Sequence, residues 1–116
     1  MGKKAKGKTS RSRKLPAGFL KFQKTYPKTF AAYDPLGAAA YAAGPLEPKV
    51  RALIKLAIAV GARTEGGVRT LTRQALRAKC TAEDIRHVVL LATTIVGFPD
   101  MISVWAWVDE VLYRKG

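Results

Sequence analysis

The stretch TEGGVRTLTRQAL, residues 64–76, carries the side chains best placed for chemistry. Glu65 and Arg69 stand four residues apart, so on a helix they face the same side and can form an ion pair. Glu65 then either complements the positive end of the helix dipole or acts as a general base, with Arg69 holding an anionic group. A neighbouring arginine favours the charged carboxylate, which suits a weak base poorly. The stretch contains neither Cys nor His, so no nucleophilic thiol or imidazole is available in it.

Three arginines follow one another at helical spacing. Arg69, Arg73 and Arg77 form a single basic stripe, and Arg63 and Lys79 flank it. Like charges at this spacing repel slightly, so the stripe gains nothing from its own helix. It is either a solvated face or a surface for a polyanion or an acidic partner.

One histidine and one cysteine complete the candidates. His87 follows Glu83 by one helical turn, and it is either a structural or interface residue or a binding residue. Cys80 lies beside Lys79 and close to a helix N-terminus, and both features favour a thiolate. A single Cys cannot form an intramolecular disulfide, and one Cys with one His cannot supply a zinc site of the usual kind. We expect an incidental thiol, no metal and no cofactor.

The elements that position these residues are predicted to be helices. Period-two alternation is almost absent, and apolar residues recur at three and four positions. The expected helices span about 16–26, 27–44 with a break or kink near Asp34 and Pro35, 47–62, 65–79, 82–96 and 100–114. Thr81 and Asp84 predict a capping box at the start of the fifth. The fold class is therefore all-α, a single-domain helical bundle of five to six helices.

Three helices carry the apolar residues expected to be buried. The core-facing stripe of 47–62 comprises Val50, Leu53, Ile54, Ala57 and Ile58. The helix over 82–96 is apolar on two sides, with Ile85, Val88, Val89 and Ala92 on one face and Leu90 and Leu91 away from it. The stripe of the last helix comprises Met101, Val104, Trp105, Val108 and Leu112, with Trp107 beside it. A helix apolar on two sides is usually sandwiched, so we expect a homo-oligomer.

The formal net charge of the 116-residue chain is +13, and it is unevenly distributed. Residues 1–14 hold seven lysines and arginines and no acid, which predicts a disordered basic tail in front of a helical domain at 15–116. No apolar run reaches the roughly 18 to 20 residues of a membrane span. The N-terminus lacks the apolar core of a signal peptide. We expect a cytoplasmic protein with no membrane partner.

The segments KVRALIKLAIAVGA and EGGVRTLTRQALRAKCTAEDIRHVVLLATTIVGFPDM resemble the carboxymuconolactone decarboxylase-like family, which includes the alkyl hydroperoxidase D type peroxidases. The likeness covers roughly 47–110 and extends more loosely toward residue 22. It implies a helical bundle of the alkyl hydroperoxidase D-like type, commonly assembled as trimers or hexamers.

The same resemblance implies that the family's peroxidase site is missing. The positions of its two cysteines fall on Thr64 and Gly67, and those of its histidines and upstream glutamate on Gly66, Leu71 and Ala52. A branch that lacks the cysteines and reads Glu-Gly-Ala is closer, because Glu65 is kept. Arg69 and Leu71 replace its histidines.

Three hypotheses remain open. The chain is a family member with an altered or lost site, which if active transfers a proton on a small carbonyl or lactone substrate, with Glu65 as base. Alternatively, it is a non-catalytic member that binds nucleic acid or another polyanion through its tail and arginine stripe. The third is a plain assembly protein.

Overall fold

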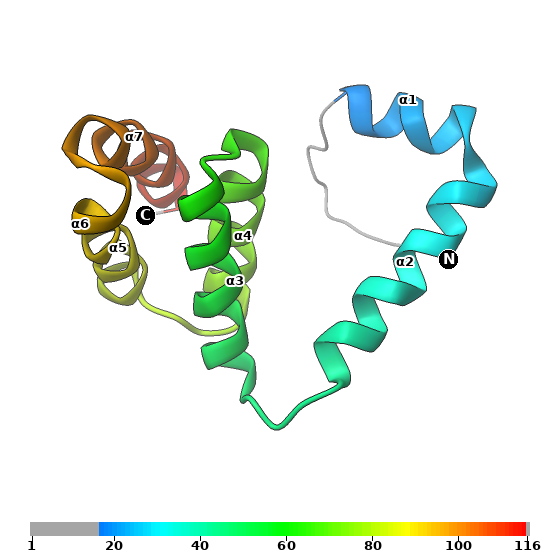
Figure 1. The fold of residues 1–116 in the computed structure, drawn as a ribbon, viewed down its shortest axis with the longest axis horizontal. Helices are drawn as coiled ribbons and strands as arrows, with labels where there is room; N and C mark the ends of the chain where they lie inside the picture. Colours follow the sequence, from blue (N-terminus) through cyan, green and yellow to red (C-terminus); the bar gives the residue numbers. More distant parts are fainter. Residues whose placement is uncertain (1–16, 116) are drawn as a thin grey trace. The chain divides into compact units, whose positions relative to one another are not determined.

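The computed structural model describes residues 17–115, with side chains up to Tyr113. The predicted tail at 1–14 lies outside these residues. The described residues fall into two compact units that divide between Gly44 and Pro45, and each is considered by itself (Figure 1). Every regular element among them is a helix, which confirms the all-α prediction. None of these helices is long and apolar enough to cross a membrane.

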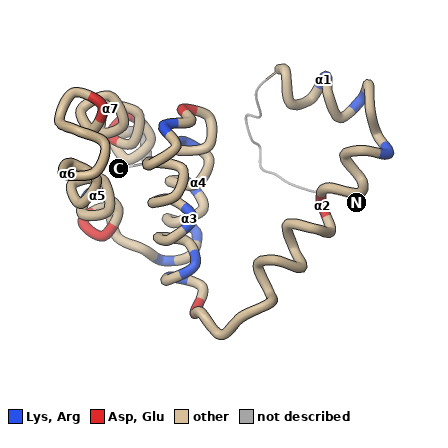
Figure 2. Tube along the Cα trace, in the orientation of Figure 1, with Lys and Arg blue, Asp and Glu red and all other residues tan. Residues whose placement is uncertain are grey.

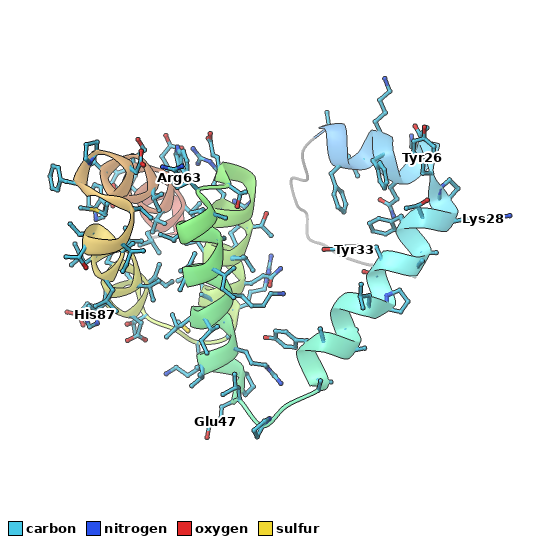
Figure 3. The ribbon with its side chains drawn as sticks, in the orientation of Figure 1. Tyr26, Lys28, Tyr33, Glu47, Arg63 and His87 are labelled. Carbon is cyan, nitrogen blue, oxygen red and sulfur yellow. The ribbon has the colours of Figure 1, made fainter. Side chains whose placement is uncertain are left out.

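The first unit contains α1 (Ala17–Thr25) and α2 (Pro27–Ala42). Its side chains make aromatic contacts, including an edge-to-face pair of Phe19 and Phe30 with ring centroids 5.4 Å apart. Neither helix has a buried residue, and Tyr26 and Tyr33 remain exposed (Figure 3). The helix was expected to break or kink near Pro35, but α2 continues through that residue. Proline removes one helical hydrogen bond, and the turns on either side maintain the helix.

The second unit is built from α3 (Pro48–Ala62), α4 (Glu65–Arg77), α5 (Ala82–Leu91), α6 (Thr93–Val96) and α7 (Phe98–Lys115). Helix α4 packs between α3 and α7, and α5 contacts both of these, so four helices enclose one core. The largest fully buried side chains are Leu56, Val60, Val68, Thr72, Ile85, Val89, Val104 and Val108. The hydroxyl of Thr72 donates to the carbonyl oxygen of Val68 at 2.7 Å, which satisfies the polar group inside the core.

Helix α3 buries a different face from the predicted one. Its buried residues are Ala52, Leu56, Ala59 and Val60. Three residues of the expected stripe, Val50, Ile54 and Ile58, are exposed within this unit. The prediction was wrong because α3 is apolar on both faces, and spacing alone does not say which face packs on α4 and α5.

The helix ends follow the local sequence. Thr81 and Asp84 form the predicted capping box, with two reciprocal hydrogen bonds of 3.0 Å. The expected helix over 82–96 is divided at Ala92 into α5 and the single turn α6. Gly97, with φ of 93°, separates α6 from α7, a backbone conformation that glycine adopts without steric cost. In α7 the predicted stripe is buried except Trp105, while Trp107 packs partly against the core.

Candidate functional site

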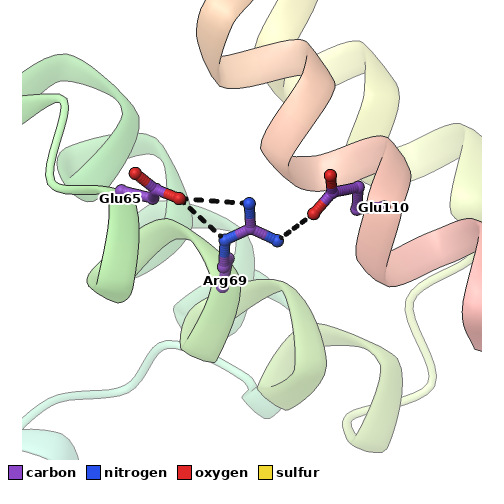
Figure 4. Close-up of polar contacts among 3 residues, drawn as sticks. All are labelled: Glu65, Arg69 and Glu110. Atoms are coloured by element: carbon purple, nitrogen blue, oxygen red, sulfur yellow. Dashed lines mark hydrogen bonds and ion pairs between the residues drawn. The ribbon is translucent and has the colours of Figure 1, made fainter. Parts of the chain in front are cut away.

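Arg69 on α4 binds two carboxylates, that of Glu65 on the same helix and that of Glu110 on α7 (Figure 4). Its Nε and Nη2 donate to Oε2 of Glu65 at 3.2 and 3.1 Å, and its Nη1 donates to Oε1 of Glu110 on α7 at 2.6 Å. The hydrogen bond to Glu110 is the main cause that raises the pKa of Arg69, which burial partly opposes. The predicted pair of Glu65 and Arg69 is present. Three of the five guanidinium N–H groups therefore donate to carboxylates.

Glu110 was not among the predicted site residues. It stands 41 residues after Arg69, and no local pattern links the two positions. The helical spacing that identified Glu65 works only within one helix. Pairing with α7 becomes visible once α4 and α7 are packed together.

The N-terminus of α4 brings Thr64 and Gly67 together. Thr64 precedes the helix in extended backbone, and its side chain makes no capping hydrogen bond with the described residues. A Cβ atom added at Gly67 would lie 2.8 Å from Oγ1 of Thr64 and 3.7 Å from Cβ of Ala59. These two positions thus face each other across one turn, at the place where the family resemblance puts two cysteines. Here they present one hydroxyl and no thiol.

The rest of the arginine stripe has no carboxylate beside it. Among the described side chains, Arg73 and Arg77 form no ion pair, whereas Arg63 pairs with Asp100 and Arg86 with Asp109. Burial lowers the pKa of Arg73, and the positive charges of Arg77 and Arg69 lower it further. The stripe is therefore locally uncompensated beyond Arg69.

Charge is also segregated between the helices of this unit. Residues 48–79 contain Lys49, Arg51, Lys55, Arg63, Arg69, Arg73, Arg77 and Lys79 against Glu65 alone. Residues 82–113 contain Arg86 against Glu83, Asp84, Asp100, Asp109 and Glu110. In Figure 2 the basic positions follow α3 and α4, and the acidic positions gather on α5 and α7.

His87 and Cys80 lie apart from the Arg69 cluster. His87 is exposed on the outer side of α5 (Figure 3). Cys80 is buried, and its Sγ lies 3.7 Å from the carbonyl oxygen of Lys49. The expectation that its surroundings favour a thiolate was wrong, because burial raises the pKa of Cys80 and the carboxylate of Asp84 raises it further. The nearby helix N-terminus is occupied by the capping box.

Comparison with known proteins places the chain in a family. Residues 27–110 match the Carboxymuconolactone decarboxylase family, and the chain belongs to that family. The crystal structure of an apo carboxymuconolactone decarboxylase family protein from Legionella pneumophila is similar, with a TM-score of 0.71 and 23% sequence identity. The match covers 84% of this chain and 86% of that one, and at this identity it shows the shared fold. No curated protein matches the chain.

Proposed function

We propose that this chain is a family member with a degenerate active site that does not reduce peroxides with a thiol. The observation that carries the proposal is the facing pair Thr64 and Gly67, which places a hydroxyl and a hydrogen atom where two thiols would be needed. A threonine hydroxyl cannot be oxidised to a disulfide. Peroxide reduction would therefore require a thiol elsewhere in the chain.

The single thiol of the chain, that of Cys80, does not meet this requirement. Cys80 is buried and its pKa is raised, so little of it is a thiolate at neutral pH. It is the sole cysteine of the sequence, so no second thiol can resolve a sulfenic acid within the chain. Glu65 and Arg69 do not replace the missing groups, because they are hydrogen-bonded to each other and Arg69 also binds Glu110.

The test is hydrogen peroxide consumption by the full chain with dithiothreitol as electron donor. We expect wild type and Cys80→Ser to consume peroxide at the same rate as buffer containing dithiothreitol alone. Turnover well above that background, lost in Cys80→Ser, would contradict the proposal.

A second function is favoured by a separate observation, the uncompensated end of the arginine stripe. Arg73 and Arg77 carry charge that no described carboxylate neutralises, on the flank of the unit where basic residues gather. Phosphate groups of a nucleic acid would neutralise this charge and release counterions. We propose non-specific polyanion binding as the alternative, with the seven charges of residues 1–14 adding to it.

The alternative is tested by the affinity for a generic DNA duplex at several salt concentrations. Each phosphate contact that is lost should reduce the slope of log affinity against log salt by about 0.9. We expect Arg73→Gln/Arg77→Gln to reduce the slope by roughly one to two. Arg63→Gln/Arg86→Gln is the matched control, because it removes the same charge from arginines already paired with Asp100 and Asp109.

Deleting residues 1–14 separates the tail from the stripe. A reduced slope in the truncated chain assigns phosphate contacts to the tail. If the truncated chain and the Arg73/Arg77 variant both keep the wild-type slope, neither the tail nor the stripe contacts phosphate, and the proposed polyanion function fails. The outcome is independent of the peroxide assay.

A further inference from the structure

The arginine stripe of α4 turns away from α7 as it approaches the end of its helix. A helix turns by about 100° per residue, so residues four apart differ in direction by about 40°. Arg69 reaches Glu110 on α7, Arg73 is half-buried, and Arg77 is exposed. Two carboxylates, those of Glu65 and Glu110, surround the single charge of Arg69 and leave this end of the stripe negative. The uncompensated positive charge therefore lies over the C-terminal end of α4.

Lys79, which directly follows α4, extends this charge from a strained backbone position. Its φ is 77°. The N–H groups of Lys79 and Cys80 donate to the carbonyl oxygens of Leu76 and Ala75, each at 3.0 Å. These are the two hydrogen bonds of a Schellman motif, in which the residue in the left-handed conformation is usually glycine. A residue with a Cβ atom is strained there, so lysine in place of glycine lowers the stability of the helix end.

The other described non-glycine residue with a positive φ shows how such a side chain is used. Arg63, at the end of α3, has a φ of 55°, and its guanidinium pairs with Asp100 on α7. Lys79 is exposed and forms no ion pair with the described side chains. Strained residues persist mainly where the strain accompanies a function. For an exposed lysine beside two uncompensated arginines, that function is the binding of an anion.

This basic surface has no aromatic ring on which a base could stack. From α3 to α6 the sequence contains no Phe, Tyr or Trp. The exposed rings of this unit all lie on α7, namely those of Phe98, Trp105 and Tyr113. They share their helical face with Asp109, which pairs with Arg86 on α5, whereas Glu110, about 100° further round the helix, pairs with Arg69 on α4. The exposed rings are therefore turned away from the stripe, and Trp107 packs against the core.

We propose that the anion is a nucleic-acid duplex, bound through its phosphates by Arg73, Arg77 and Lys79. This inference rests on the polyanion binding proposed above and names its ligand. A duplex carries one negative charge per about 1.7 Å of its axis, and each neutralised phosphate releases more counterions from a duplex than from a single strand. Phosphate contacts alone position a protein on a duplex without reading its bases. Proteins that bind single strands also stack the bases on aromatic rings, which this surface does not present.

The experiment measures the fluorescence anisotropy of a labelled DNA duplex, and of one of its strands alone, as the full chain is added at several salt concentrations. The slopes differ by about 0.2 per phosphate contact, so three contacts should make duplex binding roughly six-fold tighter at about 0.05 M salt. A single strand bound as tightly as the duplex would overturn the inference and leave polyanion binding in place. Failure of polyanion binding itself would differ, because neither form would then show salt-dependent binding.

The contact of Lys79 is tested by two substitutions. Lys79→Gln and Lys79→Gly should each reduce the slope for the duplex by about 0.9, the contribution of one phosphate contact. Lys79→Gly should also raise the midpoint of urea unfolding, because glycine adopts the left-handed backbone without strain. A variant that is more stable and yet binds the duplex less tightly cannot have lost affinity by unfolding.

Lys49→Gln is the matched control. Lys49 is exposed like Lys79, but it has an acidic neighbour. Hydrogen bonds with Thr81 are the main cause that lowers the pKa of Asp84, and the positive charge of Lys49 lowers it further. The control should keep the wild-type slope. The proposed site is wrong if both Lys79 variants keep that slope, or if Lys49→Gln reduces it as much as they do.

Discussion

At the scale of single residues, the site is defined by which charges are already satisfied. Arg69 lies between two carboxylates: Nε and Nη2 donate to Glu65 on its own helix, and Nη1 donates to Glu110 and so joins α4 to α7. Arg73, one turn further on, has no such partner among the described side chains. Two arginines on one stripe therefore differ in role. The first is hydrogen-bonded to α7, and the second is the residue through which we propose that an anionic ligand binds.

Replacing Arg69 should cost stability because it breaks a three-residue network between two helices. Arg69→Ala is expected to lower the free energy of unfolding by about 1 kcal/mol, at the upper end for partly exposed ion pairs. Arg86→Ala, which removes a single exposed pair with Asp109, should cost about 0.5 kcal/mol or less. Urea unfolding followed by circular dichroism measures both. Equal losses in the two variants would mean that the network adds nothing to its separate pairs.

Cys80 should react slowly in the folded chain. Its Sγ is buried, and its pKa lies above the usual value of 9.0, so at pH 8 iodoacetamide should modify the native thiol far more slowly than the thiol in denaturant. Linkage gives the pH dependence. Below the pKa of the unfolded thiol both states are protonated and stability is unaffected. As pH rises from there toward the higher folded pKa, the unfolded state loses its proton first, and stability falls.

The Cys80→Ser variant provides the control for the pH dependence. Its unfolding free energy should lack the decrease that wild type shows above pH 9. Rapid modification of the native thiol at pH 8 would instead show that Cys80 is accessible and ionised.

At the scale of elements, helix positions could be predicted well, and helix faces less well. Thr81 and Asp84 specify the start of α5 through contacts three residues apart, which a sequence displays directly. The orientation of α3 could not be predicted in this way, because Val50 and Ile54 are as apolar as Leu56 and Val60. Packing against α4 and α5 decides which set is buried. Glu110 was not predicted because its partner Arg69 lies on another helix, and helical spacing reveals only pairs within one helix.

The N-terminus of α4 keeps the spacing of a two-cysteine site although it holds no cysteine. A Cβ at position 67 would lie 2.8 Å from Oγ1 of Thr64, an atom whose place a cysteine sulfur would take. In a disulfide, with an S–S bond of about 2.05 Å, the distance from a sulfur to the Cβ of the other cysteine is about 3 Å. The double variant Thr64→Cys/Gly67→Cys should therefore form a disulfide under mild oxidation. Thiol titration in denaturant would then find one free thiol per chain, that of Cys80.

The matched control is Thr64→Cys/Gly66→Cys. A Cβ at Gly66 meets nothing within 4 Å, so this pair should remain reduced and titrate as three free thiols. If the two double variants oxidise to the same extent, the facing of positions 64 and 67 has no bearing on disulfide formation.

At the scale of the whole molecule, a large positive charge and an apolar groove act in opposite directions. The net charge of +13 would repel a second copy, and the apolar groove that Val50, Ile54, Leu91 and Ile95 line between α3 and the α5–α6 segment would favour the homo-oligomer that the sequence predicts. Salt screens the repulsion, because the Debye length falls from about 30 Å at 0.01 M to 10 Å at 0.1 M. Adding salt should therefore strengthen self-association while it weakens binding to DNA.

The opposite dependence on salt separates self-association from binding to DNA. Light scattering at about 0.05 and 0.5 M sodium chloride should give a higher association constant at the higher salt, and DNA affinity should decrease over the same range. Ile95→Glu should abolish the increase in the association constant and leave the decrease in DNA affinity. Self-association that weakens as salt rises would show that charge pairing and not the groove holds the copies together.

The exposed second face of α3 has a further consequence for how firmly the chain stays folded. If burial of that face is completed by a neighbouring copy, association is linked to unfolding by mass action, and the melting temperature depends on protein concentration. Dilution then separates the copies and also lowers the melting temperature of each. The amount of protein present becomes one of the quantities that set its stability.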